Sequence, residues 1–322
     1  MQILPQTINQ EEVTVLALGS KDKKIRMSPM GRQEAIAGYL FFLPCLLGLV
    51  FLTYGQMIFS LIISFTDWNV FKAPNFIGIA NYIELFKTDF YFTKSMTVTI
   101  YYALGSVLAT QLTALLMALL LNVKYIRGKV FFRTLFYLPS IVPAVASCLL
   151  WTWMMNPDFG LLNAGLEAIG LPTSRWIYGE NSAVPSMIML SAWGCGSVMV
   201  IYLAGLSNVP TTLLEAIEID GGGTWAKFHY ITIPMISPVL FYNTLMGIIA
   251  GFMSFTNTYV MTSGGPNNQT LYVNLLIYRY AFEYNRMGYA SALGWVMFIV
   301  LALITVVVFK FFGKKVYYGT GG

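Results

Sequence analysis

The chain has 322 residues, of which 57% are hydrophobic and only 10% are charged. Soluble proteins carry about 25% charged residues, so this composition excludes an ordinary soluble protein and indicates a polytopic membrane protein. The net charge of +5 does not indicate nucleic-acid binding, because the basic residues are scattered between apolar runs.

The first 35 residues are mixed and polar, and we expect them to form a tail outside the membrane domain. They contain one short apolar stretch, at 13–18, which follows Glu11 and Glu12. This stretch is too short and has the wrong flanks for a signal peptide.

Six apolar runs are long enough to cross a membrane as helices, since a span needs about 20 residues. Pro139 and Pro143 lie within the third run and predict a kink or a re-entrant segment there. The fold class we predict is therefore an all-α polytopic membrane protein with six transmembrane helices, at about 36–66, 95–123, 130–155, 183–208, 237–262 and 289–312.

The distribution of Lys and Arg predicts the orientation. Thirteen of them lie in the N-terminal tail, the second and fourth loops and the C-terminus, and six lie in the other loops. The positive-inside rule then places both termini in the cytoplasm, together with the loop at 209–236. The expected organisation is a cytoplasmic tail at 1–35, a membrane domain at 36–313 and a second cytoplasmic tail at 314–322. The three outer loops are long enough to form short helices or a docking face.

The 209–236 segment is polar and interrupted by glycines, in contrast to the apolar runs around it. Pro210 is suited to opening a helix. In that helix Leu213, Leu214 and Ile217 share one face at helical spacing, and Glu215 and Glu218 lie on another. Such a short amphipathic helix is not stable alone in water.

Three consecutive glycines, Gly221, Gly222 and Gly223, predict the end of this helix, because glycine accepts the left-handed conformation of a helix stop. A second helix is expected from Thr224 to Pro234, with Trp225 and Phe228 as apolar anchors. The physical pattern leaves two interpretations open: a connector on the membrane surface, or a helix that docks into a groove of a partner.

The spacing of the 209–236 segment resembles the EAA loop of ABC importer permeases. The pattern is a Glu-Ala pair, a Gly five residues after the Ala, an Ile ten residues after the Gly, and then a hydrophobic residue followed directly by Pro. Ile217, Gly222 and Ile233 depart conservatively from the family pattern, and the matching positions are Glu215, Ala216, Gly221, Ile231 and Pro234.

The rest of the chain after about residue 35 resembles permeases of the maltose and oligosaccharide importers, a carbohydrate branch of that family with the type I importer fold. Gly55 stands where such proteins often have proline, which puts a kink at that point in doubt. The segments that carry the resemblance are SFTDW at 64–68, FIGIANY at 76–82, FRTLFYLP at 132–139, NPDFGLLN at 156–163, GGP at 264–266 and YASA at 289–292.

The resemblance implies a subunit of a bacterial cytoplasmic-membrane importer. Its partners would be a second, homologous permease, two cytoplasmic ATPase subunits that bind ATP and Mg, and an extracytoplasmic solute-binding protein that delivers a sugar or oligosaccharide. The chain has no GxxxxGK[ST] motif, so we expect neither ATP hydrolysis nor a cofactor of its own. The residues implied in coupling to the ATPase are Leu214, Glu215, Ala216, Ile217, Asp220, Gly221, Phe228, Ile231 and Pro234.

Polar residues in the fifth run are the best candidates for the substrate pathway, although hydrogen bonding between helices explains them equally well. Ser254, Asn257 and Thr258 would share one face of a continuous helix. Gln111, with Thr110 and Thr113, is a weaker candidate, and Trp193 and Tyr202 are interpreted as packing or interfacial residues. The predicted pathway residues are Asn243, Ser254, Phe255, Asn257, Thr258 and Tyr259, with Thr256 in the same polar cluster.

No arrangement of residues indicates a metal site or a catalytic nucleophile. The single histidine, His229, has no ligand-type neighbour at metal-binding spacing, and Cys45, Cys148 and Cys195 lie apart within apolar runs. The alternatives to a transporter subunit are an intramembrane enzyme and a stand-alone channel. The cargo stays open between a neutral oligosaccharide and an acidic one, such as an alginate or pectin fragment, and no basic residue lies within the fifth-run cluster.

Overall fold

A computed structural model of the chain describes residues 29–123 and 126–313. Most of the expected N-terminal tail and all of the expected C-terminal tail lie outside these residues. Within them the regular elements are helices, and β pairing is limited to one isolated bridge between Thr66 and Phe76. The prediction of an all-helical chain is confirmed for this part.

The described residues fall into two units, one before and one after the boundary between Phe59 and Ser60. The first unit contains α2 (Pro29–Leu47), the π-helical stretch η1 (Gly48–Gly55) and the first half of α3 (Gln56–Ile63). Pro44 lies within α2, and the π-helical stretch follows it and ends at Gly55. The helix geometry of the first predicted span is thus irregular even though Gly55 replaces proline.

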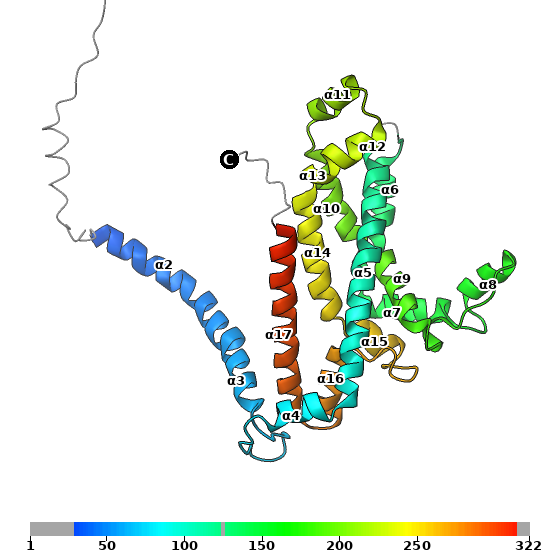
Figure 1. Cartoon of the computed structure of the whole chain (residues 1–322). Coiled ribbons are helices and arrows are strands. Elements are labelled where there is room, and N and C mark those ends of the chain that lie inside the picture. Colours follow the sequence, from blue (N-terminus) through cyan, green and yellow to red (C-terminus); the bar gives the residue numbers. More distant parts are fainter. Residues whose placement is uncertain (1–28, 124–125, 314–322) are drawn as a thin grey trace, which may run out of the picture. The chain divides into compact units, whose positions relative to one another are not determined.

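The second unit is built around α5 (Phe90–Asn122), which runs beside α9, α10 and α14 (Figure 1). Asp89 begins this helix by accepting hydrogen bonds from the backbone N–H groups of Tyr91 and Phe92, at 2.8 and 3.1 Å. Such a cap satisfies donors that the first turn leaves free.

The third predicted run is broken, as its two prolines predict. It consists of α6 (Lys129–Tyr137), a 3-10 turn η2 (Leu138–Ile141) and α7 (Ala144–Met154), with a bend of 97° between the two parts. Pro139 lies in the 3-10 turn and Pro143 immediately precedes α7. The predicted kink is confirmed.

The fourth run is also bent, which the sequence pattern does not predict. α9 (Ala183–Trp193) and α10 (Gly196–Ser207) meet at 49°. A Cβ on Gly196 would lie 2.6 Å from the carbonyl oxygen of Phe136. The bend therefore lies where the chain touches the backbone of α6, a contact between segments far apart in the sequence.

The fifth run is not the continuous helix 237–262 that the sequence analysis expects. α14 (Ser237–Phe252) ends ten residues early, and a separate short helix, α15 (Thr256–Met261), follows. The side-chain amide of Asn274 donates to the carbonyl oxygen of Phe252, at 3.2 Å, and so occupies an acceptor at the end of α14. This partner is 22 residues away and leaves no local signal in the sequence.

Short helices occupy the expected outer loops and the 209–236 segment. The loops contain α4 (Ala80–Lys87), α8 (Leu161–Ala168), η3 (Trp176–Tyr178), α16 (Val273–Tyr278) and the π-helical η5 (Arg279–Glu283), before the final helix α17 (Met287–Phe312). The 209–236 segment contains α11 (Thr211–Ile219), α12 (Thr224–Ala226), the π-helical η4 (Lys227–Thr232) and α13 (Ile233–Met235).

Three helical segments of the described chain are long and apolar enough to cross a membrane: Pro29–Ile63, Phe90–Asn122 and Met287–Phe312. Three bent helix pairs raise this number to six if each pair is one span. These pairs are Lys129–Ile141 with Ala144–Met154, Ala183–Trp193 with Gly196–Ser207, and Thr224–Met235 with Ser237–Phe252.

Close packing between α5 and α14 depends on small residues. A Cβ on Gly251 would lie 2.8 Å from Cα of Ala103, and one on Gly247 would lie 3.2 Å from Cγ2 of Val107. Gly247 and Gly251 form a GxxxG pair, the spacing that lets membrane helices approach closely.

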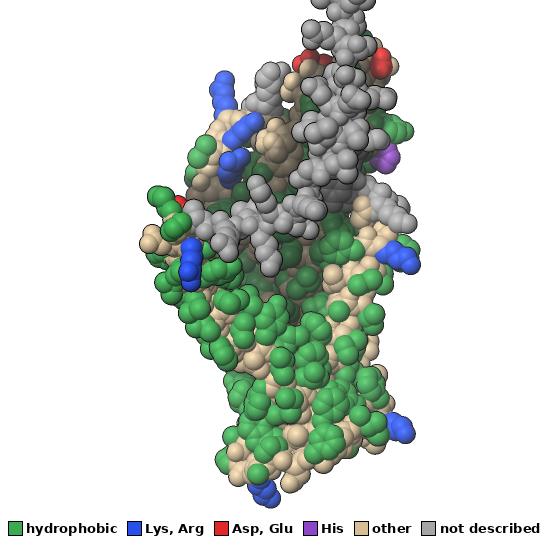
Figure 2. Space-filling model, turned by 90° about the vertical axis from the view of Figure 1, so that its left-hand side faces the viewer, with side chains coloured by type: hydrophobic (Ala, Val, Ile, Leu, Met, Phe, Trp, Pro, Cys, Tyr) green, Lys and Arg blue, Asp and Glu red, His purple; other side chains and the backbone are tan. Residues whose placement is uncertain are grey.

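The outer surface of the bundle is apolar. Leu108, Leu112 and Leu116 on α5 are each at least 60% exposed, and Leu303 and Val306 on α17 are exposed to a similar degree. Hydrophobic side chains cover most of the described surface on the face shown in Figure 2, where charged side chains are sparse. An exposed apolar surface of this extent is unfavourable in contact with water and favourable in contact with lipid.

Candidate functional site

The 209–236 segment forms two helical parts joined at glycines. Asp220 ends α11, and Gly221 follows it with a φ of +81°, in the left-handed region that favours glycine. A Cβ on Gly222 would lie 2.8 Å from both the side chain and the carbonyl oxygen of Ile217. The predicted glycine stop is confirmed, and the turn needs Gly221 for its conformation and Gly222 for its small size.

The two parts also contact each other beyond this turn. α11 packs against η4, and Nζ of Lys227 lies 2.5 Å from Oε2 of Glu218. This hydrogen bond and the charge of Lys227 lower the pKa of Glu218. The second helical part ends at Met235, one residue beyond Pro234, where the sequence predicts the end.

Several large apolar side chains of the 209–236 segment face solvent. Leu214 and Ile217 are half-buried, but Leu213 of the same predicted face is exposed. Ile219, Trp225 and Tyr230 are 86%, 73% and 70% exposed. Glu215, Ala216, Asp220 and Gly221 are exposed too, and Phe228, Ile231 and Pro234 are half-buried. The segment thus presents a mixed apolar and acidic surface.

His229 lies on this surface as part of a small aromatic group. Its ring stacks on that of Trp225, with centroids 6.4 Å apart, and meets that of Tyr230 edge-on at 5.1 Å. Among the residues described, no group of three or more His, Cys, Asp or Glu side chains could hold a metal ion.

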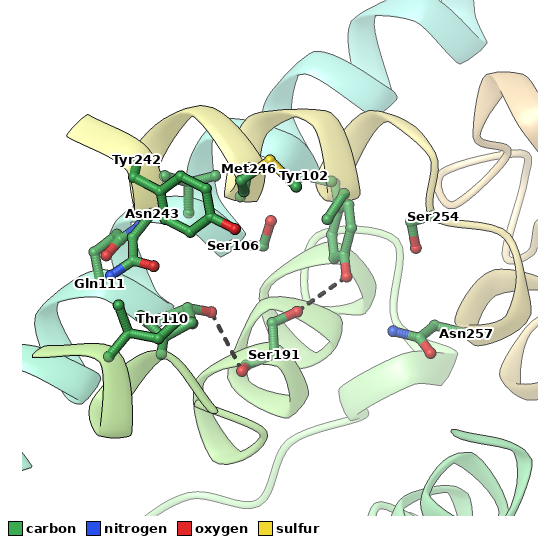
Figure 3. Close-up of a pocket in the computed structure, with 16 residues that line it drawn as sticks. Tyr102, Ser106, Thr110, Gln111, Ser191, Tyr242, Asn243, Met246, Ser254 and Asn257 are labelled. Carbon is green, nitrogen blue, oxygen red and sulfur yellow. Dashed lines mark hydrogen bonds between the residues drawn. The ribbon is translucent and has the colours of Figure 1, made fainter. Parts of the chain in front are cut away.

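A cavity of about 480 Å³ lies between α5, α14 and the α9–α10 pair, as Figure 3 shows. None of its sixteen lining residues carries a charge. Three of the six predicted pathway residues line it: Asn243 on α14, Ser254 in the break after α14, and Asn257 on α15. Hydroxyls, amides and aromatic rings next to apolar groups suit an uncharged, hydroxyl-rich ligand.

The other three predicted pathway residues do not line this cavity. Thr258 is fully buried, and its hydroxyl donates to the carbonyl oxygen of Thr270. The rings of Phe255 and Tyr259 stack on each other, with centroids 5.2 Å apart, and both contact Tyr278. The shared face expected for Ser254, Asn257 and Thr258 does not exist, because Ser254 lies between two helices.

Part of the cavity lining lies on α5 and was not predicted. Tyr102 and Ser106 line the cavity together with Thr110 and Gln111, and the Tyr102 hydroxyl lies 2.9 Å from that of Ser191 on α9. Tyr102, Ser106 and Thr110 follow one another at four-residue spacing, so a polar stripe on an apolar helix was visible in the sequence. Trp193 packs edge-on against Trp151. The three cysteines are predicted to be packing residues; Cys148 and Cys195 are buried, but Cys45 is exposed.

At the other end of the second unit, an ionic and aromatic cluster joins two of the loops that the sequence predicts to lie outside. Arg286 forms two hydrogen bonds with the carboxylate of Glu84 on α4, at 2.8 and 2.6 Å. The Arg286 guanidinium lies 4.4 Å from the ring centroid of Tyr289, and the hydroxyls of Tyr280 and Tyr289 both donate to Asp89. The cluster ties the start of α5 and of α17 to the helix α4.

We expect Glu84→Gln to lower the free energy of unfolding by about 1 kcal/mol, because it weakens a bidentate ion pair that is about 40% exposed and so partly screened by solvent. Thermal unfolding of the detergent-solubilised protein measures this effect. Lys87→Gln changes one charge at an exposed position of the same helix and serves as the control. Equal unfolding temperatures for the two variants would show that the ion pair does not hold these loops.

Comparison with known proteins identifies the family. Residues 112–317 match the family of binding-protein-dependent transport system inner membrane components. The chain belongs to this family. Over 291 residues, 89% of this permease and 94% of its relative, it is 39% identical to the probable ABC transporter permease protein YesP of Bacillus subtilis.

Two further proteins resemble this permease over most of its length. The arabinooligosaccharides transport system permease protein AraP of Bacillus subtilis is 30% identical over 305 residues, covering 94% of the permease and 96% of AraP. A chain of a bacterial ABC transporter involved in the import of the acidic polysaccharide alginate superimposes with a TM-score of 0.76, covering 88% of the permease and 96% of that chain. At 22% identity, this second likeness shows a shared fold.

Proposed function

We propose that this permease is one of two membrane-spanning subunits of an ATP-driven importer for a saccharide delivered by a solute-binding protein. The family match over residues 112–317 carries this proposal. The uncharged cavity lined by hydroxyls, amides and aromatic rings supports a saccharide as the cargo, as does the name of a relative that transports arabinooligosaccharides.

In this proposal the three long helices and the three bent pairs account for six spans, and the part of the third pair before Ser237 belongs to the 209–236 segment and lies outside the membrane. The excess of Lys and Arg in alternate loops supports cytoplasmic termini and a cytoplasmic 209–236 segment. The opposite loops, with the Glu84–Arg286 cluster, would then face the binding protein.

The 209–236 segment would dock into a groove of an ATPase subunit. Ile219 and Trp225 are exposed large apolar side chains, and such side chains usually anchor a helix in a groove. The glycine turn and the Glu218–Lys227 ion pair hold the two helical parts in a fixed relation. Closure of the ATPase dimer would thus move α10 and α14, the helices on either side of the segment. ATP and Mg would be bound by the ATPase subunits.

An uptake experiment tests this function. Bacterial cells with and without the gene are given labelled arabinotriose, maltotriose and an alginate trisaccharide, two neutral probes and one acidic. We expect uptake of at least one probe to require the gene, its binding protein and ATP. An intramembrane enzyme would give gene-dependent modification of a lipid or peptide without uptake, and a stand-alone channel would pass the probe in liposomes without ATP. Either result would contradict the proposal.

A further inference from the structure

The connection between α5 and α6 carries a dense group of basic residues. Four Lys and Arg residues lie within positions 124–133, directly after the end of α5. The chain has no Asp or Glu between Asp89 and Asp158, so no acidic residue close in the sequence balances their charge. Basic clusters of this size next to a membrane helix are typical of segments that bind anionic lipids.

Three of these basic residues lie in the described part of the chain, and we call them the basic face: Arg127, Lys129 and Arg133. Lys129 and Arg133 are four residues apart on α6, so they lie on one side of this helix. Arg127 and Arg133 are exposed, and Lys129 is half-buried. The salt bridges found among the described residues all use other cations. The basic face therefore carries positive charge that no described carboxylate pairs with.

Exposed apolar side chains share α6 with the basic face. Val130, Phe131 and Leu135 are 79%, 67% and 48% exposed. α6 packs beside α5 (Figure 1), whose last turns expose Leu116 and Leu120. An acidic protein surface would match the charge of the basic face but not these apolar side chains. A lipid with an anionic headgroup matches both, because its charge lies next to its acyl chains.

The order of side chains along α6 also fits the layers of a membrane. Lys129 and Arg133 lie within about 6 Å of each other along the helix axis, since a helix rises 1.5 Å per residue. Arg133 is the last charged residue before Asp158, so the rest of the third run, through the bend into α7, is uncharged. Positive charge at one end and apolar side chains beyond it correspond to lipid phosphates and hydrocarbon.

We propose that the basic face binds the headgroup of an anionic phospholipid, whose acyl chains pack against the exposed apolar side chains of α6. The phosphate diester supplies the negative charge that the two guanidinium groups and the ammonium group of the basic face otherwise lack. The bound headgroup holds the start of α6 at the level of the lipid phosphates. This inference goes beyond the proposed function, because it depends neither on the cargo nor on ATP.

The test measures lipid binding to the full-length permease, purified in detergent with any subunits that stay bound. Native mass spectrometry counts the lipid molecules on the protein as phosphatidylglycerol is added, and phosphatidylcholine with the same acyl chains is the zwitterionic comparison. We expect the tightest site to prefer phosphatidylglycerol by about tenfold or more. Raising the ammonium acetate concentration from about 0.1 to about 1 M should remove this preference, because the screening length falls from about 10 to about 3 Å.

The triple variant Arg127→Gln/Lys129→Gln/Arg133→Gln removes the charge of the basic face. Its apparent dissociation constant for phosphatidylglycerol is expected to rise about a hundredfold, since each Lys or Arg near an anionic surface contributes about fivefold. Arg127→Lys/Arg133→Lys keeps the charge and should bind within about threefold of the wild type. The unfolding temperatures measured without added lipid should equal that of the wild type, which shows that the variants are folded.

A second triple variant, Lys72→Gln/Lys87→Gln/Arg175→Gln, is the matched control. It also removes three positive charges, all at exposed positions, but these residues are scattered over segments that the sequence predicts to lie on the opposite side. This variant should bind phosphatidylglycerol as the wild type does.

Three results would overturn the proposal. Wild-type affinity in the variant without the basic face would show that these residues do not hold the lipid. An equal loss in the matched control would mean that net charge alone attracts phosphatidylglycerol. If the variant instead lost a bound subunit while its lipid binding stayed normal, the basic face would be a contact with that protein. Failure of the proposed function would leave the lipid measurement unchanged, because the measurement requires neither uptake nor ATP.

Discussion

Replacing Gly221 with valine is expected to reduce saccharide uptake and transport-coupled ATP hydrolysis at least tenfold. A fall of this size corresponds to about 1–2 kcal/mol of strain from a left-handed backbone in the 209–236 segment. Gly221 has a φ of +81°, a conformation in which a β-branched residue is strongly disfavoured. Relief of this strain would turn α11 away from η4 and change the exposed surface of Ile219 and Trp225, which docks on the ATPase in the proposed function.

A neighbouring glycine provides the control for this experiment. Gly223 has a φ of −77°, and a Cβ there would meet nothing within 4 Å. Gly223→Val should therefore leave uptake close to normal. Both variants should reach the membrane in wild-type amounts, as immunoblots of membrane fractions can show. Equal uptake by the two variants would refute the role given to the turn.

Gly288→Ala is expected to destabilise the fold by about 3 kcal/mol, the upper range for a side chain forced into a packed site. A Cβ at this position would lie 2.0 Å from the carbonyl oxygen of Thr66 and 3.0 Å from that of Ile63. Both neighbours are backbone atoms, so rotation of a side chain cannot relieve the contact. The backbone N–H of Gly288 also donates to the carbonyl oxygen of Trp68, at 3.0 Å.

The same substitution on the same helix should have the opposite sign at Gly294. A Cβ there would meet nothing within 4 Å, and alanine favours a helix over glycine by about 0.5–1 kcal/mol. Thermal unfolding of the detergent-solubilised variants should therefore show a lower transition temperature for Gly288→Ala and an equal or higher one for Gly294→Ala. A similar loss for both would mean that the contact with the backbone of Ile63 and Thr66 is not what requires glycine at position 288.

The sequence predicts those features of the fold that depend on neighbouring residues. Apolar runs mark where most of the long helices lie, because each run reflects one local property. Pro139 and Pro143 predict the break of the third run, since proline disrupts a helix wherever it stands inside one. Gly221 predicts the turn after α11, because glycine adopts the left-handed conformation of a helix stop without strain.

Other features depend on contacts between distant segments and could not be predicted in this way. α14 ends at Phe252, where the amide of Asn274 takes its carbonyl oxygen. The bend before Gly196 lies where α10 meets the backbone of α6. In the site, the fifth run correctly predicts three residues of the cavity lining. Thr258 does not line the cavity, because its hydroxyl donates to the carbonyl oxygen of Thr270, which lies outside that run. Residue type alone does not distinguish a polar group bonded within the protein from one that faces a cavity.

The bent pairs have a consequence for the synthesis of the protein. α9 and α10 contain 11 and 12 residues, whereas crossing the hydrocarbon core takes about 20. Neither half can therefore partition into the bilayer on its own while the chain emerges from the ribosome. If the α9–α10 pair is one span, as proposed, its integration has to wait until both halves have been made, whereas the long helices α5 and α17 can each insert individually.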